Sequence, residues 1–240
     1  MEQLKAIVMG ASSGMGKELA RILSNNNYIV GLAARRINLL AEMQKELPGK
    51  SYIKQIDISR FTDAEKEFRE LLAEMGGADL VIISSGYGDS NPQLQWDIEK
   101  ETIDVNVAGF TLIASIAFQY FLEKGSGHLA GISSVAALRG NRSDPAYSAS
   151  KAYVSNYLEG LRQRAVHSRK PIFITDIMPG FVKTPMSKGG NLFWLATAEE
   201  AAEQIFDAIR GIKKLAYITR KWRLIAWIMK VAPDWLYNKM

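Results

Sequence analysis

The sequence predicts an α/β fold: a single doubly wound domain whose mainly parallel sheet of seven strands has helices on both faces. Short apolar stretches rich in Ile, Val and aromatic residues alternate with longer stretches of helical period. No Pro- or Ser-rich linker, repeat or low-complexity run interrupts this alternation. Strands that alternate with helices are typical of parallel sheets buried on both faces.

The expected elements follow one another with little chain between them. We expect strands at 4–10, 28–34, 51–57, 79–85, 127–133, 172–178 and 215–219, and helices at 14–25, 36–46, 62–75, 97–123, 146–168 and 197–210. We expect one domain, with 1–220 as its body and 221–240 as a basic, apolar helical extension. Ligands of such open sheets bind beyond the carboxyl ends of the strands.

The composition excludes several kinds of chemistry and of partner. The sequence has no cysteine, so disulfides and cysteine-held zinc or iron–sulfur sites are impossible. Residues 213–240 hold seven Lys/Arg and one acid, which leaves 1–212 at −1 within a total charge of +5. A basic body would be typical of nucleic-acid binding. Because residues 1–212 are nearly neutral, we expect no nucleic-acid partner.

The first residues of the chain bear on its location. Residues 5–10 already have the pattern of a buried strand, and no charged-then-apolar leader precedes them. No apolar run approaches the ~20 residues that span a bilayer. We therefore expect a cytoplasmic protein.

A glycine-rich loop follows the first expected strand. It reads Gly10-Ala11-Ser12-Ser13-Gly14-Met15-Gly16, and an expected helix begins within it. Glycines allow a tight turn and a close approach of backbone N–H groups to a pyrophosphate, and the helix N-terminus adds a favourable dipole. A plain turn is the alternative, but a strand before and a helix after are the context of a dinucleotide-binding loop.

The end of the second strand favours NADP over NAD. An acid about 20 residues after the loop would bind the ribose 2′-hydroxyl of NAD, and Ala34 stands at that place. We expect Arg35 to pair with the 2′-phosphate of NADP, with a hydroxyl from Ser12. We expect Arg36 to be a solvated residue that opens the next helix.

The strongest local signal is a tyrosine–lysine pair on one helix face. Tyr147 and Lys151 are four residues apart, and Ser134 ends the fifth strand thirteen residues before Tyr147. A tyrosine has an ordinary pKa of ~10, and a nearby ammonium lowers that pKa towards a useful range for proton transfer. The Y-x-x-x-K spacing alone also fits a surface pair, whereas its combination with the serine and the glycine loop is specific.

The glycine loop with Ser134, Tyr147 and Lys151 resembles the short-chain dehydrogenase/reductase family, in its NADP-preferring, single-domain Rossmann form. The resemblance spans about residues 4–220 and implies a dinucleotide-binding catalytic domain that moves a hydride between nicotinamide and a carbonyl or alcohol. It implies that Tyr147 supplies the proton, Lys151 lowers the tyrosine pKa and holds the nicotinamide ribose, and Ser134 orients the carbonyl. Asn106 matches the residue that holds a relay water. Homodimers or homotetramers without a metal are also implied.

The resemblance also places the cofactor, NADP(H), along the chain. The expected contacts are Gly10, Ser12, Ser13, Gly14, Met15, Gly16, Arg35, Asp57, Ile58, Ser85, Gly86, Tyr147, Lys151, Pro179, Gly180, Val182 and Thr184. Asp57 matches the position that contacts adenine, and a helix or turn cap is the alternative. Pro179-Gly180 and Thr184 match the segment against the nicotinamide, and a strand-ending turn is the alternative.

Two stretches depart from the family pattern. Met9 stands where the family usually has Thr, and 83–86 read Ile-Ser-Ser-Gly where it commonly has Asn-Asn-Ala-Gly. Gly86 preserves the backbone room, and Ser84 takes the place of an asparagine. The hydrogen bonds near the adenosine therefore differ from those of the family.

The end of the chain bears on the substrate. Residues 181–196 match the lid of relatives, and Met186, Leu192, Phe193, Trp194 and Leu195, with a Gly189-Gly190 hinge, predict a mobile, apolar lid. An apolar small-molecule substrate is therefore expected.

The pattern of residues 221–231 predicts a short helix, apolar on most sides and with basic ends. This helix covers the pocket, packs on another subunit or lies in a membrane interface. The first two alternatives are favoured over the third.

Three functions follow from these features. The leading hypothesis is a soluble NADPH-dependent carbonyl reductase. The second is a membrane-peripheral reductase of a lipid 3-keto compound, suggested by the end of the chain. The third is a non-catalytic NADPH-sensing regulator, against which the intact Ser134, Tyr147 and Lys151 argue.

Overall fold

The fold is a parallel sheet whose strand order reverses next to the first strand. The computed structural model describes residues 3–184 and 194–237. The strands are β1 Lys5–Met9, β2 Ile29–Ala34, β3 Ser51–Gln55, β4 Leu80–Ile83, β5 Gly127–Ile132, β6 Ile172–Pro179 and β7 Leu215–Ile218. They pair in parallel in the order β3-β2-β1-β4-β5-β6-β7. All seven expected strands are confirmed, and the reversal between β1 and β4 creates the crevice where such sheets bind ligands.

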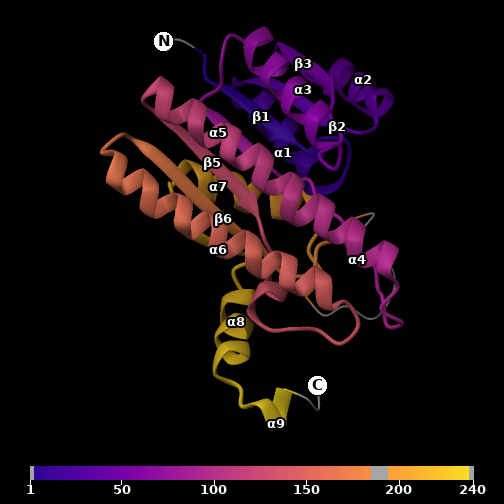
Figure 1. Ribbon diagram of the computed structural model, residues 1–240. Helices are drawn as coiled ribbons and strands as arrows, with labels where there is room; N and C mark the ends of the chain where they lie inside the picture. Colours follow the sequence, from indigo (N-terminus) through magenta and orange to yellow (C-terminus); the bar gives the residue numbers. More distant parts are fainter. Residues whose placement is uncertain (1–2, 185–193, 238–240) are drawn as a thin grey trace.

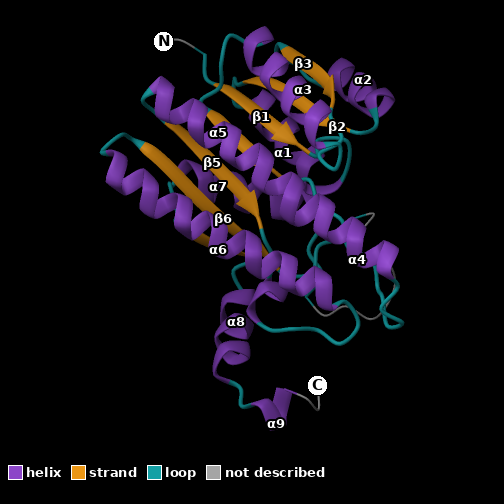
Figure 2. Cartoon of the chain, in the orientation of Figure 1, coloured by secondary structure: helices purple, strands orange, loops and turns teal. Residues whose placement is uncertain are grey.

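Helices cover both faces of the sheet (Figures 1 and 2). They are α1 Gly14–Asn25, α2 Ile37–Glu46, α3 Phe61–Glu74, α4 Trp96–Ile103, α5 Phe110–Lys124, α6 Pro145–Ser168, α7 Ala198–Arg210, α8 Trp222–Val231 and α9 Asp234–Tyr237. A π-helical turn, η1 Asp104–Gly109, joins α4 to α5, and a 3-10 turn, η2 Val135–Leu138, follows β5. The expected helix 97–123 is therefore one run with a π turn inside it, which periodicity alone does not predict.

Each face of the sheet has its own apolar core. Residues of α3, α5 and α6 form one buried cluster, and residues of α1, α2 and α7 form the other. Alternate residues of β1 divide between them: Ile7 and Met9 enter the first, and Ala6 and Val8 enter the second. Burial on both sides explains why most strand residues are apolar, and it favours the strand ends as the place for polar side chains.

Within residues 3–184 and 194–237, one helical run is long and apolar enough to cross a membrane by length and composition alone. It is Trp96–Lys124, whose most apolar window of 18 residues has a mean hydropathy of 1.6 and is 56% buried. Ile113, Ala117 and Phe121 of this run are fully buried in the core against the sheet. Packing on the sheet therefore accounts for its apolar character. The expectation that no run approaches spanning length is too strong for this segment.

The end of the chain lies beyond the carboxyl ends of the strands (Figure 1). Helix α8, expected at 221–231, is present, and its Trp222 is buried. A Cβ on Gly180 would come within 2.0 Å of the Trp222 ring, so α8 packs directly on the residue that follows β6. The extension thus adjoins the edge of the sheet where the candidate site lies.

Burial makes His128 the acid-sensitive residue of the core. Its ring lies between β5 and β6, and Nε2 shares a hydrogen bond of 2.8 Å with Thr175 Oγ1. Burial lowers the pKa of His128 to about 4, whereas an unfolded histidine titrates near ~6.5. Because the unfolded chain binds the proton first, this stability is present above about pH 6.5 and is lost as the pH falls towards 4.

We predict that His128→Gln reduces the loss of stability between about pH 7 and about pH 5. The His128 contribution to that loss is about 2 kcal/mol, because at pH 5 an unfolded histidine is almost fully protonated and the buried one is mostly neutral. Urea unfolding at several pH values measures it. The matched control is His167→Gln, since His167 is exposed near the end of α6. Equal pH dependence in the two variants would contradict the role of His128.

Candidate active site

The glycine loop is held tightly between β1, β2 and the segment after β4. Gly10 and Gly14 have φ values of +87° and +55°, a region where glycine carries no Cβ penalty. A Cβ on Gly10 would lie 2.7 Å from the Ser85 nitrogen, and one on Gly16 would lie 2.3 Å from the Gly10 oxygen. These glycines therefore permit a close backbone approach at the N-terminus of α1, where the first N–H groups have no partner within the helix.

Arg36 reaches the glycine loop and Arg35 does not. Arg36 Nη2 donates to Ser12 Oγ at 2.8 Å and to Ser13 Oγ at 2.7 Å. Arg35 Nη1 lies 3.6 Å from Glu101 Oε1, and its side chain is half exposed. Because Arg36 precedes the first helical residue of α2, its side chain turns back over the loop. Arg36 is exposed and stands just before α2, as expected, and its contacts with the loop serines are what the sequence did not predict.

After β3, the Asp57 side chain caps a turn, which is the alternative to adenine contact that the sequence left open. Asp57 Oδ1 accepts hydrogen bonds from Ser59 N at 3.1 Å and Ser59 Oγ at 2.7 Å. Ile58 is buried, and a Cβ on Gly109 would lie 2.4 Å from the Ile58 oxygen. The turn after β3 is thus locked against η1. Contact of Asp57 and Ile58 with adenine stays a prediction.

Ser134, Tyr147 and Lys151 come together beyond the ends of β5 and β6. The Ser134 hydroxyl lies near enough to the Tyr147 phenol to lower its pKa, and it accepts a hydrogen bond from Ala136 N at 3.1 Å. The Lys151 ammonium lies 5.7 Å from the centre of the Tyr147 ring and donates to Ile132 O at 3.0 Å. The expected i, i+4 pair therefore lies in one group with the strand-ending serine.

Asn106 ties the loop after β4 to the helix that bears Tyr147. It lies in η1, and π turns within helices often occur at functional sites. Its Oδ1 accepts from Tyr87 N at 2.8 Å, and its Nδ2 donates to Tyr87 O at 2.7 Å and to Ser150 Oγ at 3.0 Å. Ser150 Oγ donates in turn to Tyr147 O at 2.7 Å. Three hydrogen bonds thus hold the amide side chain beside α6.

Burial has the largest effect on the pKa values of Tyr147 and Lys151. Burial raises the pKa of Tyr147, the hydrogen bond from Ser134 opposes this rise, and the charge of Asp144 adds to it. Burial lowers the pKa of Lys151 to about 8, against the opposing effect of Asp176. The sequence leads one to expect a lowered tyrosine pKa; desolvation reverses that direction because it disfavours the phenolate.

Two acids at this site, Asp176 and Asp144, were not predicted from the sequence. Asp176 is buried on β6, where its carboxylate accepts from Ser133 Oγ at 2.5 Å and from Ser155 Oγ at 2.6 Å. Its charge raises the pKa of Lys151, so Asp176 supports the buried ammonium. Asp144 stands at the N-terminus of α6, and burial, with Glu99, raises its pKa to about 6. The sequence does carry a signal for Asp176, because a carboxylate inside a mostly apolar strand is unusual.

The segment after β6 continues the site towards the end of the chain. Ser134 Oγ lies 3.5 Å from Pro179 O, and Gly180 N donates to Ile218 O at 2.5 Å. Val182 is buried and bridges to Ala196. Thr184 is described and half-buried. The expected lid residues Met186, Gly189, Gly190, Leu192 and Phe193 lie outside the described residues, whereas Trp194 and Leu195 are described and exposed.

The arrangement suits a dinucleotide. Only glycine fits the close contacts at Gly10 and Gly16, which leaves backbone room for a pyrophosphate at the start of α1. Arg36, Ser12 and Ser13 form a cationic, hydroxyl-lined corner beside this loop. Among residues 3–184 and 194–237, no three His, Asp or Glu side chains are grouped to hold a metal ion.

Comparisons with known proteins identify the family. The sequence profile described as short chain dehydrogenase matches residues 4–192. An uncharacterized oxidoreductase of Myxococcus xanthus is 32% identical over 248 residues, which cover 99% of this chain and 96% of that protein. An uncharacterized oxidoreductase of Mycobacterium tuberculosis is 33% identical, over 88% of this chain and 82% of that protein. The chain therefore belongs to the short-chain dehydrogenase/reductase family of oxidoreductases.

Solved structures agree on the fold. A short-chain dehydrogenase from Sphingobium yanoikuyae, in complex with NADPH, superposes with a TM-score of 0.82 at 20% identity. The match covers 99% of this chain and 96% of that one. At such low identity the likeness concerns the Rossmann-type architecture, which the sequence predicted.

We predict that Asp144→Asn lowers the pKa of Tyr147, because it removes a negative charge that disfavours the phenolate. The phenolate absorbance in the near ultraviolet, titrated against pH with a Tyr147→Phe background subtracted, measures the pKa directly. Asp97→Asn, at an exposed acid of α4, is the control. A Tyr147 midpoint that stays in place, or that moves equally in the control, would count against this electrostatic coupling.

Proposed function

We propose that the protein is an NADP(H)-dependent oxidoreductase that transfers a hydride between nicotinamide and a carbonyl or alcohol group of a small, apolar substrate. The single observation that supports it best is the grouping of Ser134, Tyr147 and the buried Lys151 ammonium. This grouping lies at the same edge of the sheet as the glycine loop. The homo-oligomeric state and the cytoplasmic location stay predictions.

The roles of the residues follow from their chemistry. When bound, the nicotinamide supplies or accepts the hydride. In the reducing direction Ser134 orients the carbonyl oxygen, and Tyr147 donates its phenolic proton to that oxygen as negative charge develops there. The raised pKa of Tyr147 keeps the phenol protonated at neutral pH. Lys151, with a pKa of about 8, is mostly charged at neutral pH and stabilises the phenolate left behind.

The corner around the glycine loop supports NADP as the preferred cofactor. A guanidinium and two hydroxyl groups already meet there through Arg36, Ser12 and Ser13, and such groups bind phosphate by charge-assisted hydrogen bonds. Ala34 places no carboxylate at the end of β2. We assign the 2′-phosphate contact to Arg36 together with Arg35, which the sequence favoured.

One observation favours a second candidate, a reductase of a lipid ketone such as a 3-keto compound. The exposed apolar side chains of α8 adjoin the strand ends, because Trp222 of the same helix packs on Gly180. Activity on long-chain ketones alone, in an assay that grades substrates from small and polar to long-chain, would favour this candidate. The non-catalytic sensor would instead bind NADPH tightly and turn over none of the panel.

We predict that Tyr147→Phe lowers kcat/KM for ketone reduction by about 10²- to 10⁴-fold, the range of a lost general acid. NADPH binding should change little, because only a hydroxyl is removed. NADPH oxidation and NADPH fluorescence titration measure the two quantities. The matched control is Tyr153→Phe on the same helix, where the lost hydroxyl pairs with Thr111 Oγ1. Full activity in Tyr147→Phe would overturn the catalytic assignment.

We predict that Arg36→Ala weakens NADPH binding by about 10- to 100-fold, the size of lost hydrogen bonds to a charged group. NADH binding should stay within a few-fold, since NADH lacks the 2′-phosphate. Parallel KM measurements with both cofactors test this. Arg35→Ala measures the share of the neighbouring arginine, and Lys45→Ala, at an exposed lysine of α2, is the control. Equal losses for NADPH and NADH would contradict a phosphate contact.

A further inference from the structure

Helix α8 has apolar side chains on two faces, and the body of the protein packs against one of them. Trp222 and Ala226 are 3% and 1% exposed. The Trp222 indole covers Gly180 and meets Phe181 edge-on, with ring centroids 5.1 Å apart. This packed face fixes α8 against the end of β6.

The far end of α8 is held by Arg139, which follows η2. Arg139 Nη1 donates to Ala232 O at 2.9 Å and to Met229 O at 3.4 Å, and Nη2 pairs with Asp234 Oδ1 at 2.6 Å. A cation at a helix C-terminus is favoured by the helix dipole. The helix is therefore anchored at both ends, and its outward face has a defined direction.

That outward face is a continuous apolar stripe. Leu224, Trp227, Ile228 and Val231 are 60%, 62%, 40% and 58% exposed. Their spacing of i, i+3, i+4 and i+7 places them on one side of the helix. We call these four residues the α8 stripe. Single exposed apolar residues are ordinary, whereas a contiguous group marks an interaction site.

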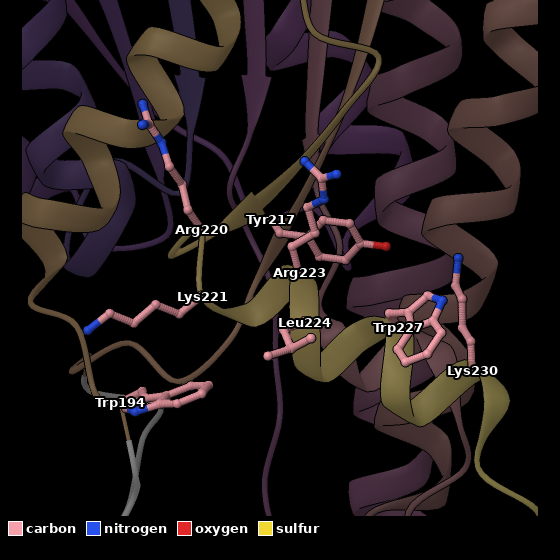
Figure 3. A pocket seen from close by; sticks show the side chains of 8 residues that line it. All are labelled: Trp194, Tyr217, Arg220, Lys221, Arg223, Leu224, Trp227 and Lys230. Atoms are coloured by element: carbon pink, nitrogen blue, oxygen red, sulfur yellow. The ribbon is translucent and has the colours of Figure 1, made fainter.

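Basic residues lie within α8 and just before it. Arg220, Lys221, Arg223 and Lys230 are all exposed. Figure 3 shows Lys221 and Lys230 towards opposite ends of the helix, with the Leu224 side chain between them. All four basic residues line a hollow of about 650 Å³ next to α8, together with Leu224 and Trp227 of the stripe. The surface therefore combines apolar side chains with cations of one sign.

We propose that the α8 stripe and its flanking cations dock on the surface of an anionic lipid bilayer, with α8 lying in the plane of the interface. A ten-residue helix is about 15 Å long, too short to cross a hydrocarbon core of about 30 Å. Tryptophan and Lys/Arg are typical anchors at the level of the headgroups. Cations near such a surface are attracted to its negative potential.

Charge argues against a second copy of the chain as the occupant. A two-fold contact brings the same surface of both copies together, so it would place both sets of four cations at one interface. The acid nearest to α8 in sequence, Asp234, is already paired with Arg139. Like charges facing each other oppose association, whereas an anionic bilayer complements them.

Docking would bring the strand ends close to the lipid surface. Trp222 packs on Gly180, and the neighbouring Pro179 O lies 3.5 Å from Ser134 Oγ. The docking itself is independent of the proposed activity, because it uses no residue of the catalytic set. It can therefore succeed or fail in the test below whatever the outcome of the activity assays.

The test is co-sedimentation of the full-length protein with lipid vesicles. Phosphatidylcholine vesicles and vesicles that also contain phosphatidylserine are compared at low and high salt. We expect sedimentation with the phosphatidylserine vesicles, weakened by salt because salt screens exposed charges. Trp227→Ser with Leu224→Ser should lower the partition coefficient by about tenfold or more. Arg223→Gln with Lys230→Gln should lower it by about 25-fold, about fivefold for each cation.

Matched controls separate the surface from general effects. Trp96→Ser removes an equally exposed tryptophan from α4, and Lys45→Gln with Arg164→Gln removes two exposed cations elsewhere. These variants should bind vesicles as the unchanged protein does, and thermal unfolding checks that all variants are folded. Failure to sediment, or equal losses in variants and controls, would overturn the proposal. So would an oligomer, seen by light scattering, that Trp227→Ser with Leu224→Ser dissociates while vesicles are not bound.

Discussion

The parallel direction of all seven strands is the constraint on which the rest of the molecule depends. Both faces of the sheet are buried, so most strand residues are apolar and many polar side chains gather where the strands end. Parallel strands end at one edge. The glycine loop after β1, the segment after β4, Ser134 after β5 and Gly180 after β6 therefore meet there. The direction of the strands therefore sets the location of the site, whichever residues stand there.

Burial then sets the electrostatics of the site. Desolvation raises the pKa of Tyr147, Asp144 and Asp176 and lowers the pKa of Lys151, in each case against the charged form. Local partners partly oppose these shifts: the Ser134 hydroxyl acts on Tyr147, and the carboxylate of Asp176 acts on Lys151. The result is a phenol that keeps its proton beside an ammonium that is close to titration.

The two ends of the site face different surroundings. At the β1–β2 end, Arg36 and the loop serines form a polar corner that suits a phosphate. At the β6 end, Trp222 and Phe181 cover the backbone with aromatic rings, and α8 continues outward as the exposed α8 stripe. A polar end that suits a phosphate and an apolar end next to the extension agree with the function proposed above.

The sequence by itself determined the alternation of strands and helices, the glycine loop and the Ser134–Tyr147–Lys151 set. Each of these depends on local periodicity or on fixed spacing along the chain. Only the tertiary structure decided that Arg36 reaches Ser12, that Asp176 supports Lys151 and that a π turn holds Asn106. These contacts join residues far apart in the chain, and pKa directions depend on burial. Likewise, the periodicity of α8 predicted an apolar helix, whereas packing on Gly180 decided which face remained exposed.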